Sequence, residues 1–355
     1  MNIVGIDVSK AKLDCAWIAS PTSGKVKNKV FMNTPNGHQQ LMDWAIKQSK
    51  EAIESLHFVM EATSIYHEAV AYALYEAGAQ VSVANPAQIR DYARSLGTRT
   101  KTDKKDSVVI TRFGLTQPLR LWQPEPEEIR TLKALISRLS AVEQDIQREN
   151  NRLEKARISR VSEEVIVSVQ TVLAQLKKEK KRLEELINQH IEGHPSLKKD
   201  RVLLESIPGI GPVVSRMMLS VIRSRAFESA SQCAAFMGLV PVQHESGSSI
   251  RGRARLSKAG NAQHRAKLYM AAVVSIQYNP DIQRQYERLL KQGKVKMSAL
   301  CAAMRKLVHI CFGVLKHQQP YQPPPCHQLG HVSTGRLADE RVRRHEADRG
   351  RAGRR

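Results

Sequence analysis

The chain has 355 residues, 41% of them hydrophobic, and its 56 lysines and arginines exceed 34 aspartates and glutamates to give a formal charge of +22. Such a length accommodates more than one core, so two or three domains are expected. The charge argues against an enzyme of small metabolites and indicates a polyanionic partner whose condensed counterions Lys and Arg displace. Because Phe, Trp and Tyr make up only 5% of the chain, we expect phosphate contacts rather than base stacking.

Signals for membrane insertion or secretion are not expected. No apolar run approaches the roughly 20 residues that a spanning helix needs, and the sequence passes from Met1 straight into a strand-like run without a signal peptide. The five cysteines form no C-x-x-C pair, which is typical of reduced residues. We therefore expect a cytoplasmic, nucleoid-associated protein.

Residues 1–125 predict an α/β domain. The apolar runs 2–8 and 12–19, joined by a tight link, predict a hairpin, to which the alternating run 25–33 adds a third strand. Helices and buried-type strands then alternate: a helix near 37–50, a strand at 56–62, a helix at about 66–77, a strand at 79–85, and helices on either side of 99–106. This order indicates a mixed sheet with helices on both faces.

Residues 126–195 predict long helices with a seam of coiled-coil type. Apolar residues recur every three or four positions, with Lys and Glu between them, and the register slips near 157–162. Two antiparallel helices of one chain, a pair shared between subunits and one arm of a helical bundle all fit this pattern. The fold class expected for the whole chain is therefore α/β plus all-α.

Residues 200–320 predict a mainly helical domain. Its last helix, 294–316, is apolar on one wide face and is expected to lie in the core. Residues 203–219 have the form of a helix-hairpin-helix, in which Gly209 and Gly211 would let a phosphate approach the turn and the next helix N-terminus, although a plain turn between helices fits as well. The segment 321–355, whose cations are all Arg, is expected to be a disordered basic tail.

Four carboxylates of this basic chain stand where a metal site would need them. Asp7 and Glu61 end two predicted strands, and Asp103 and Asp106 are three residues apart, so one helical turn would place both on one face. Each alone has an ordinary explanation as a turn, edge or helix-start residue, but their joint placement favours a site. Oxygen-only ligands indicate Mg²⁺ or Mn²⁺, and two such ions would clamp the attacking and leaving oxygens of a phosphodiester.

The segment HESGSSIRGRARLSKAG, residues 244–260, places serines among glycines and cations. A serine nucleophile would conserve the bond energy of a phosphodiester for rejoining, but the residues alone do not choose among Ser246, Ser248 and Ser249. The chain has no G-x-S-x-G elbow, so acyl chemistry is disfavoured. Four cations of the segment would neutralise charge on the phosphate in the transition state: Arg251, Arg253, Arg255 and Lys258.

Several of these stretches resemble one family of insertion-sequence transposases. GIDVSKAKLD, VMEATSIYHEAVAYALYEAGAQVSVANP and KTDKKDS resemble the RuvC-like, ribonuclease H-fold domain of the DEDD recombinases, the bridge-RNA-guided serine recombinases, and ESGSS-x-RG resembles their transposase domain. The resemblance extends to about Tyr321. It implies that Asp7, Glu61, Asp103 and Asp106 bind the catalytic metal.

The same resemblance implies the chemistry and the partners. Ser246 would be the nucleophile and would form a 5′-phosphoserine intermediate. The carboxylates of one subunit would meet the serine of another, and strands would exchange within a tetramer. A noncoding bridge RNA would pair with donor and target DNA, so that the protein reads shape and backbone.

Three other functions fit parts of the sequence. A metal-dependent RuvC-like nuclease or Holliday-junction resolvase would cut with water and would not need Ser246. An actin-like ATPase is suggested by GIDVSK, which resembles the first phosphate motif of that fold, but no later D-x-G-x-[ST] loop follows. A non-catalytic coiled-coil protein that binds nucleic acid would leave the buried-type Glu61 unexplained.

Overall fold

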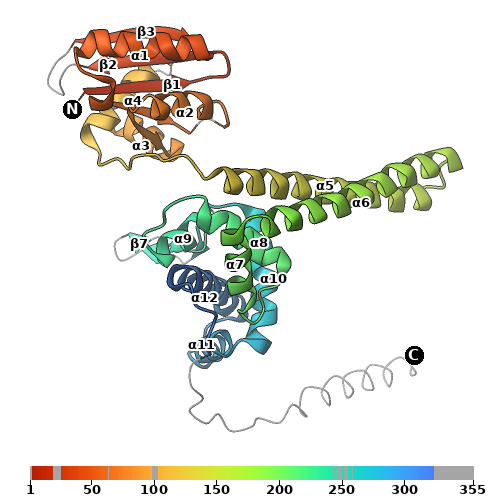
Figure 1. Cartoon of the computed structure of the whole chain (residues 1–355). Helices are drawn as coiled ribbons and strands as arrows, with labels where there is room; N and C mark the ends of the chain where they lie inside the picture. Colours follow the sequence, from red (N-terminus) through yellow and green to blue (C-terminus); the bar gives the residue numbers. More distant parts are fainter. Residues whose placement is uncertain are drawn as a thin grey trace, which may run out of the picture. The chain divides into compact units, whose positions relative to one another are not determined.

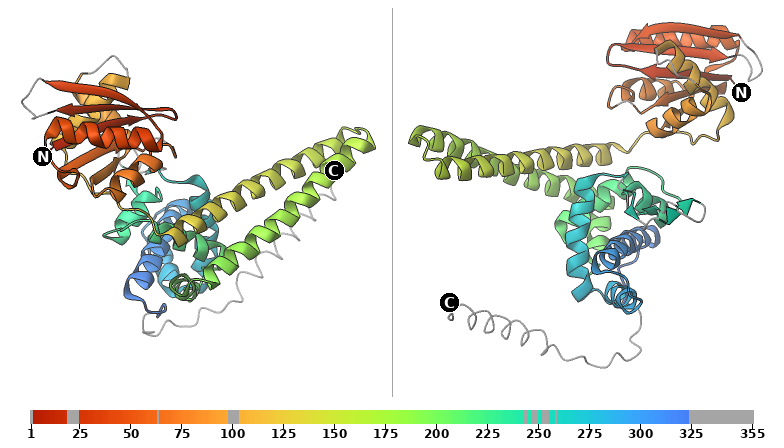
Figure 2. Two further views of the ribbon diagram at one scale, coloured as in Figure 1. Left: turned by 45° about the horizontal axis from the view of Figure 1, so that its top comes forward. Right: turned by 180° about the vertical axis from the view of Figure 1, so that it is seen from behind.

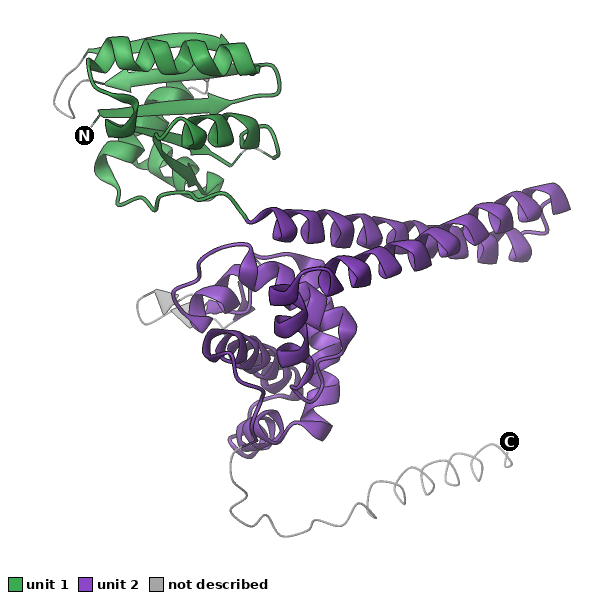
Figure 3. Cartoon of the chain, in the orientation of Figure 1, with its two compact units in different colours: residues 1–125 green, residues 126–355 purple. Residues whose placement is uncertain are grey.

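The computed structural model describes residues 2–18, 25–62, 64–97, 103–242, 245–246, 250–251, 255–257 and 259–323. Within these, only the backbone is described for 103–104, 245–246 and 250–251. The chain divides into two compact units, Met1–Glu125 and Pro126–Arg355 (Figure 3).

The first unit is built on a five-stranded mixed sheet. Its strands are β1 (Asn2–Val8), β2 (Lys12–Ile18), β3 (Val26–Met32), β4 (Leu56–Glu61) and β5 (Gln80–Ala84), in the spatial order β3-β2-β1-β4-β5. β1, β2 and β3 pair antiparallel, whereas β4 pairs parallel with both β1 and β5. The expected mixed sheet is confirmed.

Helices cover both faces of this sheet (Figures 1 and 2). They are α1 (Pro35–Ser49), α2 (Glu68–Glu76), α3 (Pro86–Ser95) and α4 (Asp103–Thr116), with a short 3₁₀ turn at Ile53–Ser55. Residues of α1 and α2 share one core cluster with Ile6 and Met60, and residues of α3 and α4 share another with Ile3 and Val59. Because successive strand residues point to opposite faces, these clusters identify the face on which each strand residue lies.

The helix starts of this unit follow from local sequence. Both α1 and α3 begin with Pro at the first helical position, where its missing N–H removes no hydrogen bond. The residue before each proline supplies the cap: the Thr34 side chain accepts from the Gly37 amide, and the Asn85 side chain accepts from the Ala87 amide.

The second unit begins with two long helices, α5 (Glu127–Ile158) and α6 (Glu163–Glu192). His190 Nε2 lies 2.8 Å from the Glu128 carbonyl, and Lys180 Nζ lies 3.4 Å from a Glu143 carboxylate oxygen. These pairs run in opposite directions along the two helices, so α5 and α6 are antiparallel partners in one chain (Figure 2). The supercoiled packing of a coiled coil stays a prediction.

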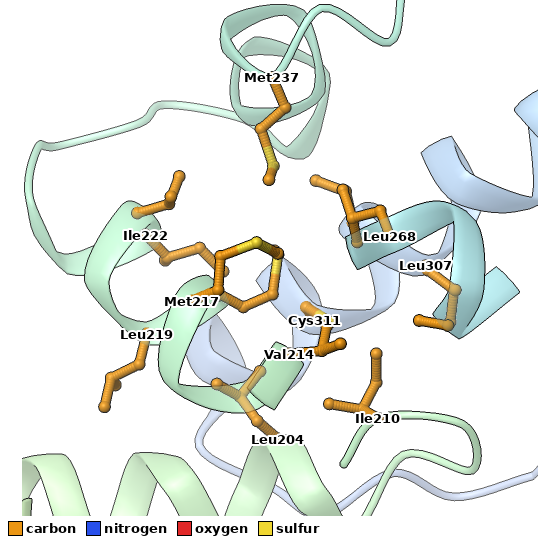
Figure 4. Close-up of a cluster of buried hydrophobic side chains, with 14 of the residues drawn as sticks. Leu204, Ile210, Val214, Met217, Leu219, Ile222, Met237, Leu268, Leu307 and Cys311 are labelled. Carbon is orange, nitrogen blue, oxygen red and sulfur yellow. The ribbon is translucent and has the colours of Figure 1, made fainter. Parts of the chain in front are cut away.

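Six further helices follow among the described residues of the second unit. They are α7 (Pro195–Glu205), α8 (Pro212–Arg223), α9 (Ala230–Phe236), α10 (Ala262–Tyr278), α11 (Pro280–Lys291) and α12 (Lys296–His317). Met217, Leu268 and Cys311 belong to its buried cluster and come from α8, α10 and α12 (Figure 4). Between α9 and α10 lie the short strands β6 (Pro241–Val242), β7 (Glu245–Ser246), β8 (Ile250–Arg251) and β9 (Arg255–Leu256).

Within the described part of the chain, α12 alone is long and apolar enough to cross a membrane, judged by length and composition. The expectation that no run approaches this length therefore needs correction, because the mean hydropathy of its best window is 1.5. More than half of that window, 56%, is buried within the protein, as expected for the core helix predicted at 294–316.

The last described residues are fastened to the helical core. Asp200, which is 2% exposed, accepts hydrogen bonds from Arg223 at 2.6 and 2.9 Å and from Gln318 at 2.8 Å. The Tyr321 amide donates to the Ser206 hydroxyl at 2.8 Å. From residue 324 onward, the expected basic tail lies outside the described residues.

Candidate active site

A close contact between β1 and α4 positions the predicted carboxylates. The Gly5 amide donates to the Thr111 hydroxyl at 3.2 Å, and that hydroxyl also lies 2.8 Å from the Ser107 carbonyl and 3.1 Å from the Ala16 carbonyl. A Cβ at Gly5 would stand 2.4 Å from the Thr111 nitrogen. Only glycine therefore lets α4 lie directly on the backbone of β1.

The contacts along α4 fix its direction. Near its end, a Cβ at Gly114 would come within 2.9 Å of methyl groups of both Ile3 and Val59. One turn earlier, Thr111 lies against Gly5. The later residue of α4, Gly114, therefore lies against the earlier residue of β1, Ile3, and the earlier residue, Thr111, lies against the later one, Gly5. The helix runs antiparallel to β1, and its first turn lies near the carboxyl end of that strand.

Asp7 and Glu61 stand side by side at this end of the sheet. Ile6 pairs with Met60 in the parallel ladder of β1 and β4, and Asp7 and Glu61 are the next residues of the two strands. Since Ile6 and Met60 point into the core under α1 and α2, Asp7 and Glu61 point to the opposite face, which α4 covers. Both side chains are partly exposed.

Asp103 and Asp106 occupy the first turn of α4. Asp106 precedes the fully buried Ile110 by four residues, so helical spacing directs its side chain towards the sheet-facing side. The side chain of Asp103 lies outside the described residues, and Asp106 is partly exposed. Three separate segments thus bring Asp7, Glu61 and the first turn of α4, which contains Asp103 and Asp106, to one edge of the sheet, which we call the carboxylate edge.

The carboxylate edge fits a hard divalent cation by its chemistry. Its donors are all carboxylate oxygens, the ligands that Mg²⁺ and Mn²⁺ prefer. Among the residues whose side chains are described, no three His, Cys, Asp or Glu come together as a group that could hold a metal ion. The described residues therefore place these carboxylates at one end of the sheet, and their binding of a metal ion stays a prediction.

Asp14 is a further carboxylate at this edge that sequence reasoning missed. It lies directly opposite Asp7 in the antiparallel ladder of β1 and β2, is 7% exposed, and pairs with Lys12 at 3.1 Å. Burial raises the pKa of the Cys15 thiol well above its ordinary value, and the charges of Asp14 and Asp7 raise it further. The signal was present, because the tight link of the predicted hairpin pairs residue 7 with residue 14.

The serine segment folds back on itself. β6 pairs with β9, where Val242 faces Arg255, and β7 pairs with β8, where Ser246 faces Ile250 and Glu245 faces Arg251. We call residues 239–259 the serine hairpin. Arg255 is exposed.

Much of the serine hairpin lies outside the described residues. Of the predicted site residues, this holds for the whole of Arg253 and Lys258 and for the side chains of Ser246 and Arg251. The other two candidate serines, Ser248 and Ser249, also lie outside.

Two glycines clamp the base of the serine hairpin, and sequence reasoning missed both. A Cβ at Gly238, whose φ is +72°, would stand 2.7 Å from the Gly260 nitrogen, and a Cβ at Gly260 would stand 2.4 Å from the Met237 carbonyl carbon. Arg265 Nη1 donates to the Gly260 carbonyl at 2.6 Å. The two ends of the hairpin therefore meet in backbone contact between α9 and α10.

The predicted helix-hairpin-helix is a turn between α7 and α8 that packs on α10. Gly209 has φ +95°, and a Cβ there would stand 2.0 Å from Ser275 Oγ. The Pro208 carbonyl accepts from the Ser275 hydroxyl at 3.2 Å and from the Asn279 amide group at 3.3 Å. Close packing against Ser275 therefore accounts for glycine at position 209. Gly211 is exposed at the start of α8, with no described atom within 4 Å of its Cβ position, and its contact with a phosphate stays a prediction.

Two family models match this chain. One, for DEDD transposases of the IS110 type and described as transposase, matches residues 4–156, and the other, described as transposase of the IS116/IS110/IS902 family, matches 201–287. The pilin gene-inverting protein of Moraxella bovis is 32% identical over 322 residues, which cover 90% of this chain and 97% of that protein. The chain belongs to the IS110 family of transposases. Of the site residues, Asp7, Glu61 and Asp106 lie within the first match and Ser246 lies within the second.

Other similar proteins cover less of the chain. An uncharacterized 43.6 kDa protein of insertion element IS110 from Streptomyces coelicolor is 26% identical over 159 residues, which are 44% of this chain and 38% of that protein. Among solved structures, RuvC of Thermus thermophilus matches 34% of this chain and 100% of its own, with 15% identity and a TM-score of 0.26.

Proposed function

We propose that this IS110-family transposase cuts and rejoins DNA with Ser246 as the nucleophile and a divalent metal at the carboxylate edge. The observation that carries the proposal is the antiparallel docking of α4 on β1, which brings the first turn of α4 to the strand ends that hold Asp7 and Glu61. Mg²⁺ or Mn²⁺, when bound by Asp7, Glu61, Asp103 and Asp106, would stabilise negative charge on the reacting phosphate.

The proposed reaction is two successive transesterifications. Ser246 Oγ attacks the phosphorus, a phosphoserine ester forms at the 5′ end, and the 3′ oxygen leaves with the proton that the serine gave up. A 3′-hydroxyl of another strand then attacks the same phosphorus, the bond between phosphorus and Ser246 Oγ breaks, and the proton of the attacking hydroxyl passes to Ser246. No external energy source is needed, because each step exchanges one phosphate ester for another.

The cations of the serine hairpin support this chemistry. Arg255 lies on β9, one of the strands at the base of the hairpin, and Arg251 lies on β8, whose backbone pairs with the strand of Ser246. With Arg253 and Lys258 they would bind the phosphate oxygens as charge builds up in the transition state. Gly247, which follows Ser246 in the sequence, would leave room for the DNA backbone.

The proposed partners are donor and target DNA and a noncoding bridge RNA that pairs with both, in the cytoplasm at the nucleoid. The net charge of +22 supports a nucleic-acid partner, and the printed name of the Moraxella relative, a gene-inverting protein, fits the rejoining of DNA. We further propose a homo-oligomer, from dimer to tetramer, in which the carboxylates of one subunit complete the site around the serine of another.

A covalent adduct tests the proposal. The full-length protein is incubated with the RNA of its element, Mg²⁺ and junction DNA labelled at the 3′ end of the cleaved strand, the part that the serine would retain, and is then resolved under denaturing conditions. We expect a labelled protein–DNA adduct from the wild type and from the matched controls Ser248→Ala and Ser249→Ala, and none from Ser246→Ala. If Ser246→Ala still forms the adduct, Ser246 is not the nucleophile.

The second candidate is a metal-dependent nuclease, because the carboxylate edge alone would suffice for it. Such an enzyme would cut with water and release both DNA ends. Cleavage that persists in Ser246→Ala, without an adduct, would replace the recombinase by this nuclease.

A further inference from the structure

The second unit holds a cavity of about 390 Å³ between α5, α8 and the start of α10. Its polar lining includes Lys133 and Ser137 of α5, Arg225 just after α8, and Asn261 and His264 at the start of α10. None of the described residues that line it carries a carboxylate. The cavity thus combines cationic and hydrogen-bonding groups with a lining that has no negative side chain.

Arg225 is held in place by an aromatic ring. Its guanidinium carbon lies 4.2 Å from the centroid of the Phe236 ring, which also lines the cavity. Stacking of this kind fixes the plane of the guanidinium, whose N–H groups point outward in that plane as a fork of donors. Such a fork is suited to the two oxygens of a phosphate.

His264 of the cavity lining lies near further cations. Burial lowers the pKa of Lys267, Glu143 opposes this, and the nearby Arg216 and Lys180 lower it further. Arg216 is only 7% exposed. Burial and the Lys267 charge likewise lower the pKa of His264. Of the groups that shift these two pKa values only Glu143 is acidic, and it lies 3.4 Å from Lys180. The charges that act on His264 and on its neighbour Lys267 are therefore mostly positive.

The cavity lies at the base of the serine hairpin. Phe236 is the last residue of α9, and Asn261 caps α10 by accepting from the Gln263 amide at 2.8 Å. Between them, Gly238 and Gly260 bring the two ends of the hairpin into contact. A ligand in the cavity would therefore lie beside the base from which the strand with Ser246 begins.

We infer that this cavity binds a backbone phosphate of a nucleic-acid strand, and that this phosphate is not the one that reacts. Lys133 and Arg225 supply the charge, Ser137 and Asn261 supply neutral hydrogen bonds, and the apolar part of the lining, which includes Ile136 and Val221, receives the adjoining sugar. The inference rests on the proposed function only in taking the anion to be nucleic acid. DNA and RNA share this phosphodiester chemistry.

Binding measurements on the full-length protein test the inference. Fluorescence anisotropy gives the dissociation constant for a short labelled DNA duplex and for a labelled RNA strand over a series of salt concentrations. For the double variant Lys133→Gln/Arg225→Gln we expect an affinity about tenfold lower for one or both probes. Its salt slope should be lower by about one to two units, because each lost phosphate contact removes roughly 0.9 for duplex and 0.7 for single strands.

The matched control replaces two exposed cations of α11, Lys291→Gln/Arg288→Gln, which do not line the cavity. Loss for the duplex alone assigns the cavity to DNA, and loss for the RNA alone assigns it to RNA. Equal affinity and salt slope in the cavity and control variants, with both probes, would overturn the inference.

A second variant covers the case in which loss of the Arg225 stacking harms the fold. Ser137→Glu places a carboxylate at an exposed helical position on the cavity lining, and we expect it to weaken binding of the same probe at least as strongly. All variants are measured in the Ser246→Ala background, so binding is read without cleavage. This test therefore does not depend on the outcome of the adduct experiment, and a negative result here does not affect the assignment of Ser246 as the nucleophile.

Discussion

The Gly5 amide of β1 donates a hydrogen bond to the hydroxyl of Thr111 in α4, 106 residues further along the chain, at 3.2 Å. Asp7 lies two residues beyond Gly5, and Asp106 lies five residues before Thr111, so this bond sets how far apart the two carboxylates stand. The metal site that we propose therefore depends on a contact that includes none of its ligands.

Substitution of Gly5 by Ala tests that dependence. The new Cβ would stand 2.4 Å from the Thr111 nitrogen, so α4 must move, and overpacking of this kind costs about 1–3 kcal/mol. We expect a lower melting temperature and at least a tenfold loss of DNA cleavage. Gly313→Ala is the control, because no described atom lies within 4 Å of its Cβ position. Wild-type cleavage by Gly5→Ala would show that the position of α4 does not matter.

The carboxylates themselves should be needed for cleavage but not for RNA binding. Asp7→Ala, Glu61→Ala and Asp106→Asn each remove a charged donor from the carboxylate edge, and we expect DNA cleavage to fall at least about a hundredfold. Gel-shift assays with the element's RNA should give dissociation constants within about twofold of the wild type. Unchanged cleavage rates would rule out the metal site.

Asp14 should tune the proposed metal site. It faces Asp7 across β1 and β2, so Asp14→Asn removes negative charge beside a ligand and should weaken attraction for a divalent cation. We expect the Mg²⁺ concentration for half-maximal cleavage to rise several-fold. Asp43→Asn, at an exposed position of α1, serves as control. A merely structural role for Asp14 would lower the melting temperature without changing the Mg²⁺ requirement.

The stability of the first unit should fall in mild acid. Burial lowers the pKa of His57 below its ordinary value of 6.5; the residue is 3% exposed, and its Nε2 lies 2.8 Å from Ser82 Oγ. Below a pH of 6.5 the His57 imidazole binds a proton more readily in the unfolded chain than in the folded one. The free energy of unfolding therefore decreases as the pH falls. Urea denaturation between neutral pH and a pH of about 5 measures this slope. His57→Gln should reduce the slope, and the exposed His317→Gln should leave it unchanged.

The fastening of the C-terminal end predicts a second stability effect. Asp200→Ala would leave Arg223 and Gln318 without their buried acceptor, and loss of hydrogen bonds to a charged group costs about 1.5–3 kcal/mol. The free energy of unfolding from urea denaturation should fall by that amount. The double variant Asp200→Ala/Arg223→Ala should lose less free energy of unfolding than the two single variants lose together, because both substitutions remove the same ion pair. Equal losses would contradict the pairing.

Local pattern was sufficient to predict the strands of the sheet. The strands predicted at 2–8, 56–62 and 79–85 were found at Asn2–Val8, Leu56–Glu61 and Gln80–Ala84, because each is a short apolar run bounded by breakers. The position of Asp7 at a strand end follows from the same periodicity.

Contacts between distant residues were beyond the reach of that pattern. Nothing local shows that Gly5 meets Thr111, or that Gly209 makes room for Ser275, because each pair joins segments at least 66 residues apart. The strands of the serine hairpin have only two residues each, too few for a recognisable alternation. The signals that were present and unused are Asp14 opposite Asp7 and the glycines 238 and 260 on either side of the serine segment.

The contact between Gly238 and Gly260 has a consequence for engineering. Because the chain leaves and re-enters the helical core at almost one point, the closure entropy of the intervening segment grows only slowly with its length. We therefore expect that residues 239–259 can be replaced by a related hairpin of different length, joined at these two glycines, without a change in the packing of α9 or α10.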